Sequence, residues 1–249
     1  MPPPSSAKPA APQLLLLHGA GLGKWIWESV IPLLEVPAVA LDLPGRNNRI
    51  DPSKVTLADC IEFVAGKTTE RSIIVGHSLS AEIALGVASA NPRGVAALVL
   101  VGGAVPESGK SFISLLPLAQ RIFLHTLLRL GRRGVQLPAS WARAQYCSDL
   151  DEPTCKMVLE RMVPEIPRLY LDDVDWAALP AGLPRWYVRL LNDQSVGLAQ
   201  QEEAIRRIRA TSVESLQTGH LPMLVRPRDT ALVLNRIAAT VASPVESPR

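Results

Sequence analysis

The sequence has 249 residues, of which 47% are hydrophobic and 20% are charged, and its formal net charge at pH 7 is +3. This composition is typical of a soluble globular chain and excludes a fibrous or wholly disordered protein. The length suits one α/β domain with an inserted subdomain better than two independent folds. Lys and Arg are spread along the chain in short clusters, so we expect solvated faces and no nucleic-acid partner.

Both ends of the sequence contain prolines. Residues 1–12 carry one lysine and lack the apolar core and cleavage pattern of a secretory signal. We expect a disordered leader over residues 1–12 and a mobile tail over residues 243–249, with a folded domain over residues 13–242 between them. The most apolar stretch, residues 112–130, is interrupted by proline and basic side chains that would be costly in a bilayer, so we expect no membrane span.

The sequence contains three cysteines, Cys60, Cys147 and Cys155. This odd number, with no histidine or second cysteine at metal-ligand spacing, indicates reduced thiols and no metal site. Reduced thiols favour a cytoplasmic location. No cofactor is predicted, and the sequence leaves the oligomeric state open, a homodimer included.

Short apolar runs alternate with longer segments of helical pattern. Such runs are typical of strands buried on both faces of a parallel sheet. The predicted strands are residues 13–17, 38–41, 72–75, 95–101, 185–191 and 212–216. The predicted helices are residues 25–34, 57–67, 80–91, 197–208 and 230–241. The alternation predicts an α/β fold with a doubly wound, mostly parallel six-stranded sheet and right-handed crossovers.

The segment from about 107 to 183 interrupts this alternation. It is rich in Leu, Arg and Pro and contains several helical patterns but no convincing strand, so we interpret it as an inserted helical cap. A cap over the carboxyl ends of the strands would roof the site that those ends form. Leu116, Phe123 and Trp141 are candidates for an apolar substrate pocket there. The alternative is that these side chains form the core of the cap.

Ser78 lies between an apolar strand and a helix, in the sequence IIVGHSLSAEIAL. A serine on so sharp a turn has strained backbone angles, projects its hydroxyl over the sheet and needs small neighbours two residues away on each side. Gly76 and Ser80 meet this need, although the usual motif, G-x-S-x-G, ends in glycine. The pattern indicates a nucleophile; the alternative for Ser78 alone is a helix N-cap.

His220 follows the last predicted strand, where a loop can carry an imidazole across the strand ends toward Ser78. A general base must come within hydrogen-bond reach of its nucleophile, and this placement allows it. We expect the other histidines, His18, His77 and His125, to be structural or to line a pocket.

Asp193 ends the penultimate strand, after Ser78 and ahead of His220 in the order that this type of triad requires. Its carboxylate would hold the imidazole tautomer and stabilise the imidazolium that forms during the reaction. The alternative acid is Glu107, which lies just beyond the strand over residues 95–101.

The sequence LHGAG closes the first strand with a glycine-rich turn. Such a turn leaves backbone N–H groups free, and those of Ala20 and Leu79 could bind the oxygen of a tetrahedral intermediate as an oxyanion hole. The alternative is an ordinary tight turn between a strand and a helix.

Six segments together resemble the α/β-hydrolase superfamily across nearly the whole folded chain: LLLLHGAGLGKWIW, ALDLPGR, VGHSLSAEIAL, LVLVGGAVPES, RLLNDQSV and TGHLPMLVRP. The HGAG turn and the GGAVPESGKSF stretch resemble the plant-type methylesterase and hydroxynitrile lyase group. The lyases carry a lysine directly after the catalytic histidine and a threonine before the oxyanion turn, where this sequence has Leu221 and Gly19. The resemblance therefore implies the esterase branch.

These residues and the resemblance predict a serine hydrolase that cleaves a small, apolar carboxylic ester through an acyl-enzyme. Ser80 also resembles α/β-hydrolase receptors that keep the triad, so a ligand-binding sensor is one alternative. Another is an enzyme of this fold with a different reaction, such as C–C bond hydrolysis or hydroxynitrile lyase chemistry, because one triad serves many chemistries.

Overall fold

The computed structural model describes residues 11–46, 50–130, 134, 136 and 138–243. Residues 1–10 of the expected leader and residues 244–249 of the expected tail lie outside the described residues.

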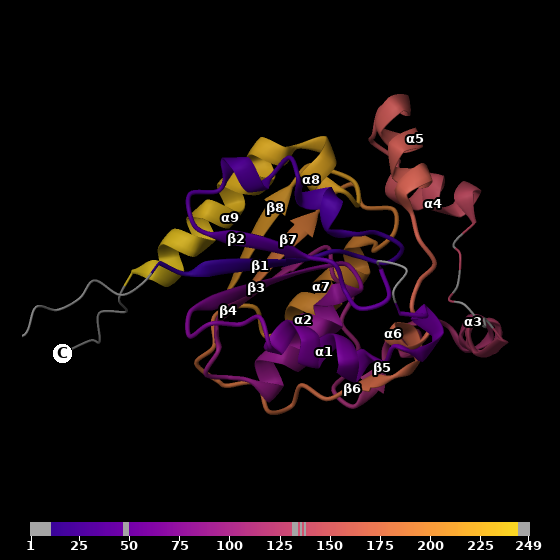
Figure 1. Ribbon diagram of the computed structural model, residues 1–249, viewed down its shortest axis with the longest axis horizontal. Coiled ribbons are helices and arrows are strands. Elements are labelled where there is room, and N and C mark those ends of the chain that lie inside the picture. Colours follow the sequence, from indigo (N-terminus) through magenta and orange to yellow (C-terminus); the bar gives the residue numbers. More distant parts are fainter. Residues whose placement is uncertain (1–10, 47–49, 131–133, 135, 137, 244–249) are drawn as a thin grey trace, which may run out of the picture.

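The centre of the described structure is a six-stranded sheet, with strands in the order β2-β1-β3-β4-β7-β8 and all neighbours parallel (Figure 1). The strands are β1 (Gln13–Leu17), β2 (Ala38–Leu41), β3 (Ser72–His77), β4 (Val95–Val101), β7 (Arg185–Leu190) and β8 (Ser212–Leu216). The predicted fold class is therefore confirmed. Only β3, which runs two residues further, and β7, which ends one residue earlier, differ from the predicted strands.

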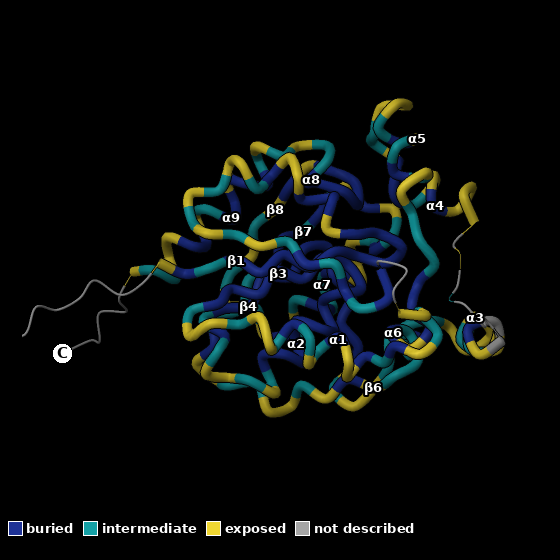
Figure 2. Tube along the Cα trace, viewed as in Figure 1, coloured by how far each residue is buried: buried dark blue, intermediate teal, exposed yellow. Residues whose placement is uncertain are grey.

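Successive side chains point to opposite sides of the sheet, and the central strands β1, β3 and β4 are buried on both sides. Leu15 and Leu17 of β1 pack into one apolar cluster, and Leu14 and Leu16 pack into the other. Figure 2 shows the centre of the sheet as a buried layer inside a partly exposed shell. The continuous apolar runs of the sequence follow from this double burial.

Helices α1 (Leu57–Ala65), α2 (Ser80–Ala90) and α7 (Leu198–Ile208) contribute to the first cluster, and α8 (Pro222–Val225) and α9 (Pro227–Ala242) contribute to the second. Helix α1 begins at a capping box, in which Thr56 and Asp59 bond each other's backbone N–H groups. Helices therefore cover both faces, as the doubly wound fold requires.

The helix predicted over residues 25–34 is wrong. The chain instead forms two 3₁₀ turns, η1 (Lys24–Trp27) and η2 (Ile31–Leu33). Pro32 has no N–H to donate to the carbonyl of Glu28, so it interrupts any continuous α-helix through this segment.

Between β4 and β7 the chain leaves the sheet, and we call this segment the insertion. It contains β5 (Lys110–Ser111), η4 (Phe112–Leu115), α3 (Leu118–Leu130), α4 (Ala139–Tyr146), α5 (Glu152–Arg161), α6 (Arg168–Leu171) and β6 (Asp173–Val174). Strands β5 and β6 pair antiparallel, although no strand was predicted here. Helices α3, α4 and α5 lie beyond one end of the sheet (Figure 1).

The three cysteines are free and buried. In the part of the chain that the structure describes, no helix has the length and apolar character needed to cross a membrane.

The close contact between β3 and α2 depends on Gly76, since a Cβ there would lie 2.7 Å from the carbonyl oxygen of Ser80. We expect Gly76→Ala to lower the free energy of unfolding by about 1–3 kcal/mol because of this overlap. Urea unfolding measures the change. Gly182→Ala is the matched control, because a Cβ at Gly182 meets no atom within 4 Å. Equal stability of the two variants would contradict the proposed packing constraint.

Candidate active site

Ser78 lies on the turn between β3 and α2 with a left-handed φ of 53°. This conformation is costly for a residue with a side chain, and the surrounding hydrogen bonds hold it in place. The Ser78 N–H donates to the carbonyl of Val101 at 3.0 Å, and the Ala81 N–H donates to the carbonyl of Ser78 at 3.0 Å. Ser80, at the position where the motif usually has glycine, is buried and donates its hydroxyl to the carbonyl of His18.

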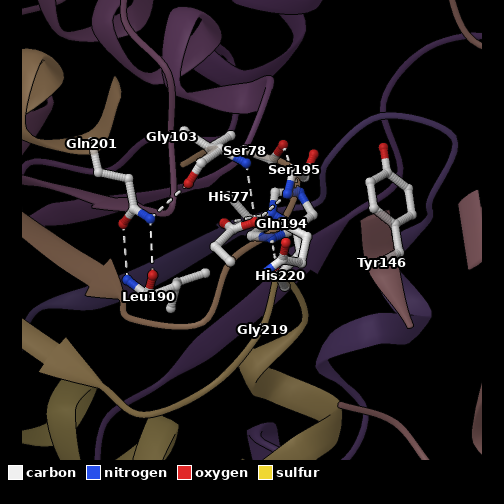
Figure 3. A network of polar contacts seen from close by, with 12 residues as sticks. His77, Ser78, Gly103, Tyr146, Leu190, Gln194, Ser195, Gln201, Gly219 and His220 are labelled. Atoms are coloured by element: carbon white, nitrogen blue, oxygen red, sulfur yellow. Dashed lines mark hydrogen bonds and ion pairs between the residues drawn. The ribbon is translucent and has the colours of Figure 1, made fainter. Parts of the chain in front are cut away.

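His220 connects Ser78 with Asp193. Ser78 and His220 are labelled in Figure 3. Its Nδ1 lies 2.8 Å from Asp193 Oδ2, and its Nε2 lies 3.0 Å from Ser78 Oγ. The imidazole and the carboxylate are both fully buried. A carboxylate only accepts hydrogen bonds, so Nδ1–H donates to Asp193, and Nε2 is left to accept the proton of Ser78. The structure brings together the three residues that the sequence singled out.

The second oxygen of Asp193 accepts two backbone N–H groups, from Ser195 at 2.7 Å and from Val196 at 3.0 Å. Gln201 on α7 fixes this loop, because its amide bonds both backbone groups of Leu190 and the carbonyl of Val196. Hydrogen bonds to both carboxylate oxygens therefore fix the orientation of Asp193.

Glu107, the alternative acid, does not occupy this position. Its side chain is 71% exposed and lies 3.9 Å from the guanidinium of Arg207.

Two other histidines lie close to the site but form no hydrogen bond with the Ser78 hydroxyl among the described residues. His77 donates its Nε2–H to the backbone carbonyl of His220 at 2.8 Å, and its ring packs 4.8 Å from the His220 ring. His18 Nε2 accepts the Leu43 N–H at 3.3 Å. Burial lowers the pKa of each imidazole to about 3, so both stay neutral. His125 lines a different cavity.

The glycine-rich turn after β1 faces Ser78. A Cβ at Gly19 would lie 3.0 Å from Ser78 Cβ, so glycine permits this approach. Among the described residues, no hydrogen bond uses the N–H groups of Ala20 or Leu79, and both residues line the same cavity as Ser78. These two donors are available to an oxygen bound beside Ser78.

A buried ion pair supports this turn from the insertion. Glu165 accepts the N–H of Gly21 at 2.6 Å and pairs with Arg46, whose side chain is 2% exposed. The Val163 N–H also donates to the carbonyl of Gly21 at 3.0 Å. Sequence reasoning missed Arg46 and Glu165, because no local pattern links residues that are 119 positions apart.

Tyr146, at the end of α4, also connects the insertion with the site (Figure 3). Its ring stacks on that of His220 with centroids 5.0 Å apart and an interplanar angle of 19°, and its hydroxyl donates to the carbonyl of Ala20 at 3.2 Å. Burial raises the pKa of the phenol, so it remains a neutral donor. Asp149 accepts the N–H of Gly219, next to His220. Neither Tyr146 nor Asp149 was singled out from the sequence.

A cavity of about 690 Å³ opens over Ser78, and we call it the Ser78 cavity. The three predicted pocket residues, Leu116, Phe123 and Trp141, all line it. Phe123 is 71% exposed and Trp141 is 41% exposed, so these two do not form a closed core of the insertion. Within the described ranges, His, Cys, Asp and Glu form no group of three that could hold a metal ion.

Comparisons with known proteins agree with this architecture. A family model described as the alpha/beta hydrolase family matches residues 14–232. A pimeloyl-[acyl-carrier protein] methyl ester esterase from Pseudoalteromonas atlantica is 34% identical over 96 residues, which make up 37% of each chain. A putative chloroplastic methylesterase from Arabidopsis thaliana is 25% identical over 91% of this chain and 56% of its own length. The chain thus spans well under two thirds of these curated relatives.

Among solved structures, an extracellular α/β-hydrolase from a Paenibacillus species superimposes with a TM-score of 0.81 at 15% identity, covering 90% of this chain and 98% of that one. At this identity the likeness shows the fold alone. The family model and the Arabidopsis relative confirm the resemblance to α/β-hydrolases of the plant methylesterase type.

The buried Arg46–Glu165 pair predicts that alanine variants at two glutamates differ in their free energy of unfolding. We expect Glu165→Ala to lower the free energy of unfolding by about 3–5 kcal/mol, because Arg46 would remain buried without its partner. Glu152→Ala, which breaks an exposed pair with Arg143, should cost less than about 1 kcal/mol. Chemical denaturation at neutral pH measures both losses. Similar losses for the two variants would show that the buried pair has no special role.

The buried His77 predicts a pH dependence of stability. Its pKa is about 3 in the folded state, against 6.5 for an ordinary histidine. Between these values the unfolded chain binds a proton that the folded chain does not, so the free energy of unfolding falls as the pH falls through this window. We expect His77→Gln to reduce the slope of the free energy of unfolding against pH by an amount that corresponds to at most one bound proton. Unfolding curves measured across the window test this, and an unchanged slope would exclude the contribution.

Proposed function

Because this chain belongs to the alpha/beta hydrolase family, we propose that it is a serine esterase that cleaves small, apolar carboxylic esters. The observation that carries this proposal is the continuous hydrogen-bonded chain from Ser78 through His220 to Asp193. This order of nucleophile, base and acid is that of the serine hydrolase triad.

In the proposed mechanism, Ser78 Oγ attacks the ester carbonyl while His220 Nε2 takes its proton. The alkoxide of the tetrahedral intermediate is bound by the N–H groups of Ala20 and Leu79. His220 then gives the proton to the leaving alcohol, and an acyl group remains on Ser78. Water activated by His220 releases the carboxylic acid, and Asp193 stabilises the imidazolium that forms in each half of the reaction.

The lining of the Ser78 cavity supports an apolar substrate, and the insertion would act as a helical cap that roofs it. Leucine and aromatic side chains dominate the lining, including Leu116, Phe123 and Trp141. The names of the two curated relatives, a methyl ester esterase and a methylesterase, support a small alcohol as the leaving group.

The free, buried thiols are consistent with the cytoplasmic location predicted from the sequence.

The direct test is ester turnover by Ser78→Ala. Removing a triad nucleophile typically costs about 10⁴-fold or more, and we expect that loss in kcat on p-nitrophenyl acetate. Ser89→Ala, which removes a hydroxyl from α2 away from the Ser78 cavity, should retain the wild-type rate. An unchanged rate for Ser78→Ala would overturn the assignment.

The two candidate acids can be separated by the same assay. We expect Asp193→Asn to lower kcat by about 10⁴-fold, because the amide cannot stabilise the correct imidazole tautomer. Glu107→Gln should have no effect, since its side chain is exposed and pairs with Arg207. The opposite result would move the role of acid to Glu107.

A further inference from the structure

A second cavity, of about 500 Å³, adjoins the Ser78 cavity. The two cavities share Ala104, Leu115 and Gln200 in their linings. The second cavity differs in character, because five charged side chains line it: Glu107, Lys110, Arg121, Glu203 and Arg207. A substrate held at Ser78 therefore has a charged compartment beside its apolar one.

One of the three cations in the second cavity is already neutralised. Arg207 donates to Glu203 at 2.9 Å, lies 3.9 Å from Glu107, and donates to the backbone carbonyl of Val105 at 2.6 Å. Its guanidinium therefore already has partners within the protein.

The other two cations, Lys110 and Arg121, have no such partners. Within the described residues neither side chain makes an ion pair, and the buried Nε of Arg121 has no hydrogen-bond acceptor. A buried donor without an acceptor is costly, and an anion that enters the cavity would supply the opposite charge that these two cations lack. Arg121 lies in the first turn of α3, and Lys110 lies in β5, so two separate elements bring their charges to this cavity.

We propose that the second cavity binds a carboxylate at the far end of the acyl chain, so that the substrates of the proposed esterase are half esters of dicarboxylic acids. The inference rests on the proposed function. The apolar part of the acyl chain occupies the Ser78 cavity, and the chain passes Leu115 and Gln200. The terminal carboxylate then accepts charge-assisted hydrogen bonds from Arg121, with Lys110 adding a second positive charge.

The surroundings favour a monoanion. Glu107 and Glu203 line the same cavity, and their negative charges would repel a phosphate dianion more strongly than a carboxylate. A planar guanidinium also matches the two oxygens of a carboxylate.

The test compares monomethyl esters of linear dicarboxylic acids with methyl esters of monocarboxylic acids of equal chain length. We expect a higher kcat/KM for one length of half ester, with the preference falling as salt is added. Arg121→Gln should lower kcat/KM for that half ester by about 10- to 100-fold and change the neutral ester by less than about twofold. Lys110→Gln should act in the same direction with a smaller effect.

Arg129→Gln is the matched control, because Arg129 is also on α3 but lines a different cavity. It should leave both substrates unaffected. Equal losses on charged and neutral esters in Arg121→Gln, or no loss on either, would overturn the carboxylate site.

A binding measurement separates this inference from the proposed function. Calorimetric titration of the Ser78→Ala variant with the half ester should show binding that the added Arg121→Gln change weakens by the same factor. Absence of turnover on every ester would refute the esterase while this titration still decides the carboxylate site. Binding that does not depend on Arg121 would refute the site and leave the esterase intact.

Discussion

The site depends on the left-handed backbone conformation of Ser78, which carries a φ of 53° between β3 and α2. Such a conformation costs about 1–3 kcal/mol in a residue with a side chain, so the surroundings must enforce it. The hydrogen bond from the Ser78 N–H to Val101 fixes the turn to β4, and the absence of a side chain at Gly19 and Gly76 lets the neighbouring backbone approach. In this conformation the Ser78 hydroxyl lies 3.0 Å from His220 Nε2.

The insertion is bound to the loops that carry the site. Tyr146 contacts the His220 ring and Ala20, Asp149 accepts the Gly219 N–H, and Glu165 accepts the Gly21 N–H. Tyr146 and Asp149 precede α5 in the chain and Glu165 follows it. The insertion therefore contacts both the turn after β1 and the loop before α8. Cavity shape and the geometry at Ser78 are thereby coupled, because a shift of the insertion would move the groups that contact His220 and the turn after β1.

The sequence predicted those features that local patterns encode. Doubly buried strands appear as continuous apolar runs, and the turn around Ser78 requires small neighbours that can be read directly. The helix expected over residues 25–34 failed because Pro32 outweighs the apolar periodicity. The pairs Arg46–Glu165 and Asp149–Gly219 could not be predicted, since they join residues 119 and 70 positions apart and depend on how the insertion folds back.

We infer that the environment of Ser78 makes its hydroxyl a nucleophile, and labelling with a fluorophosphonate tests this reactivity. We expect a single phosphonyl adduct, located on the peptide that contains Ser78, and its loss in His220→Ala when the variant retains its fold by circular dichroism. An unlabelled protein, or an adduct on a different serine, would contradict it.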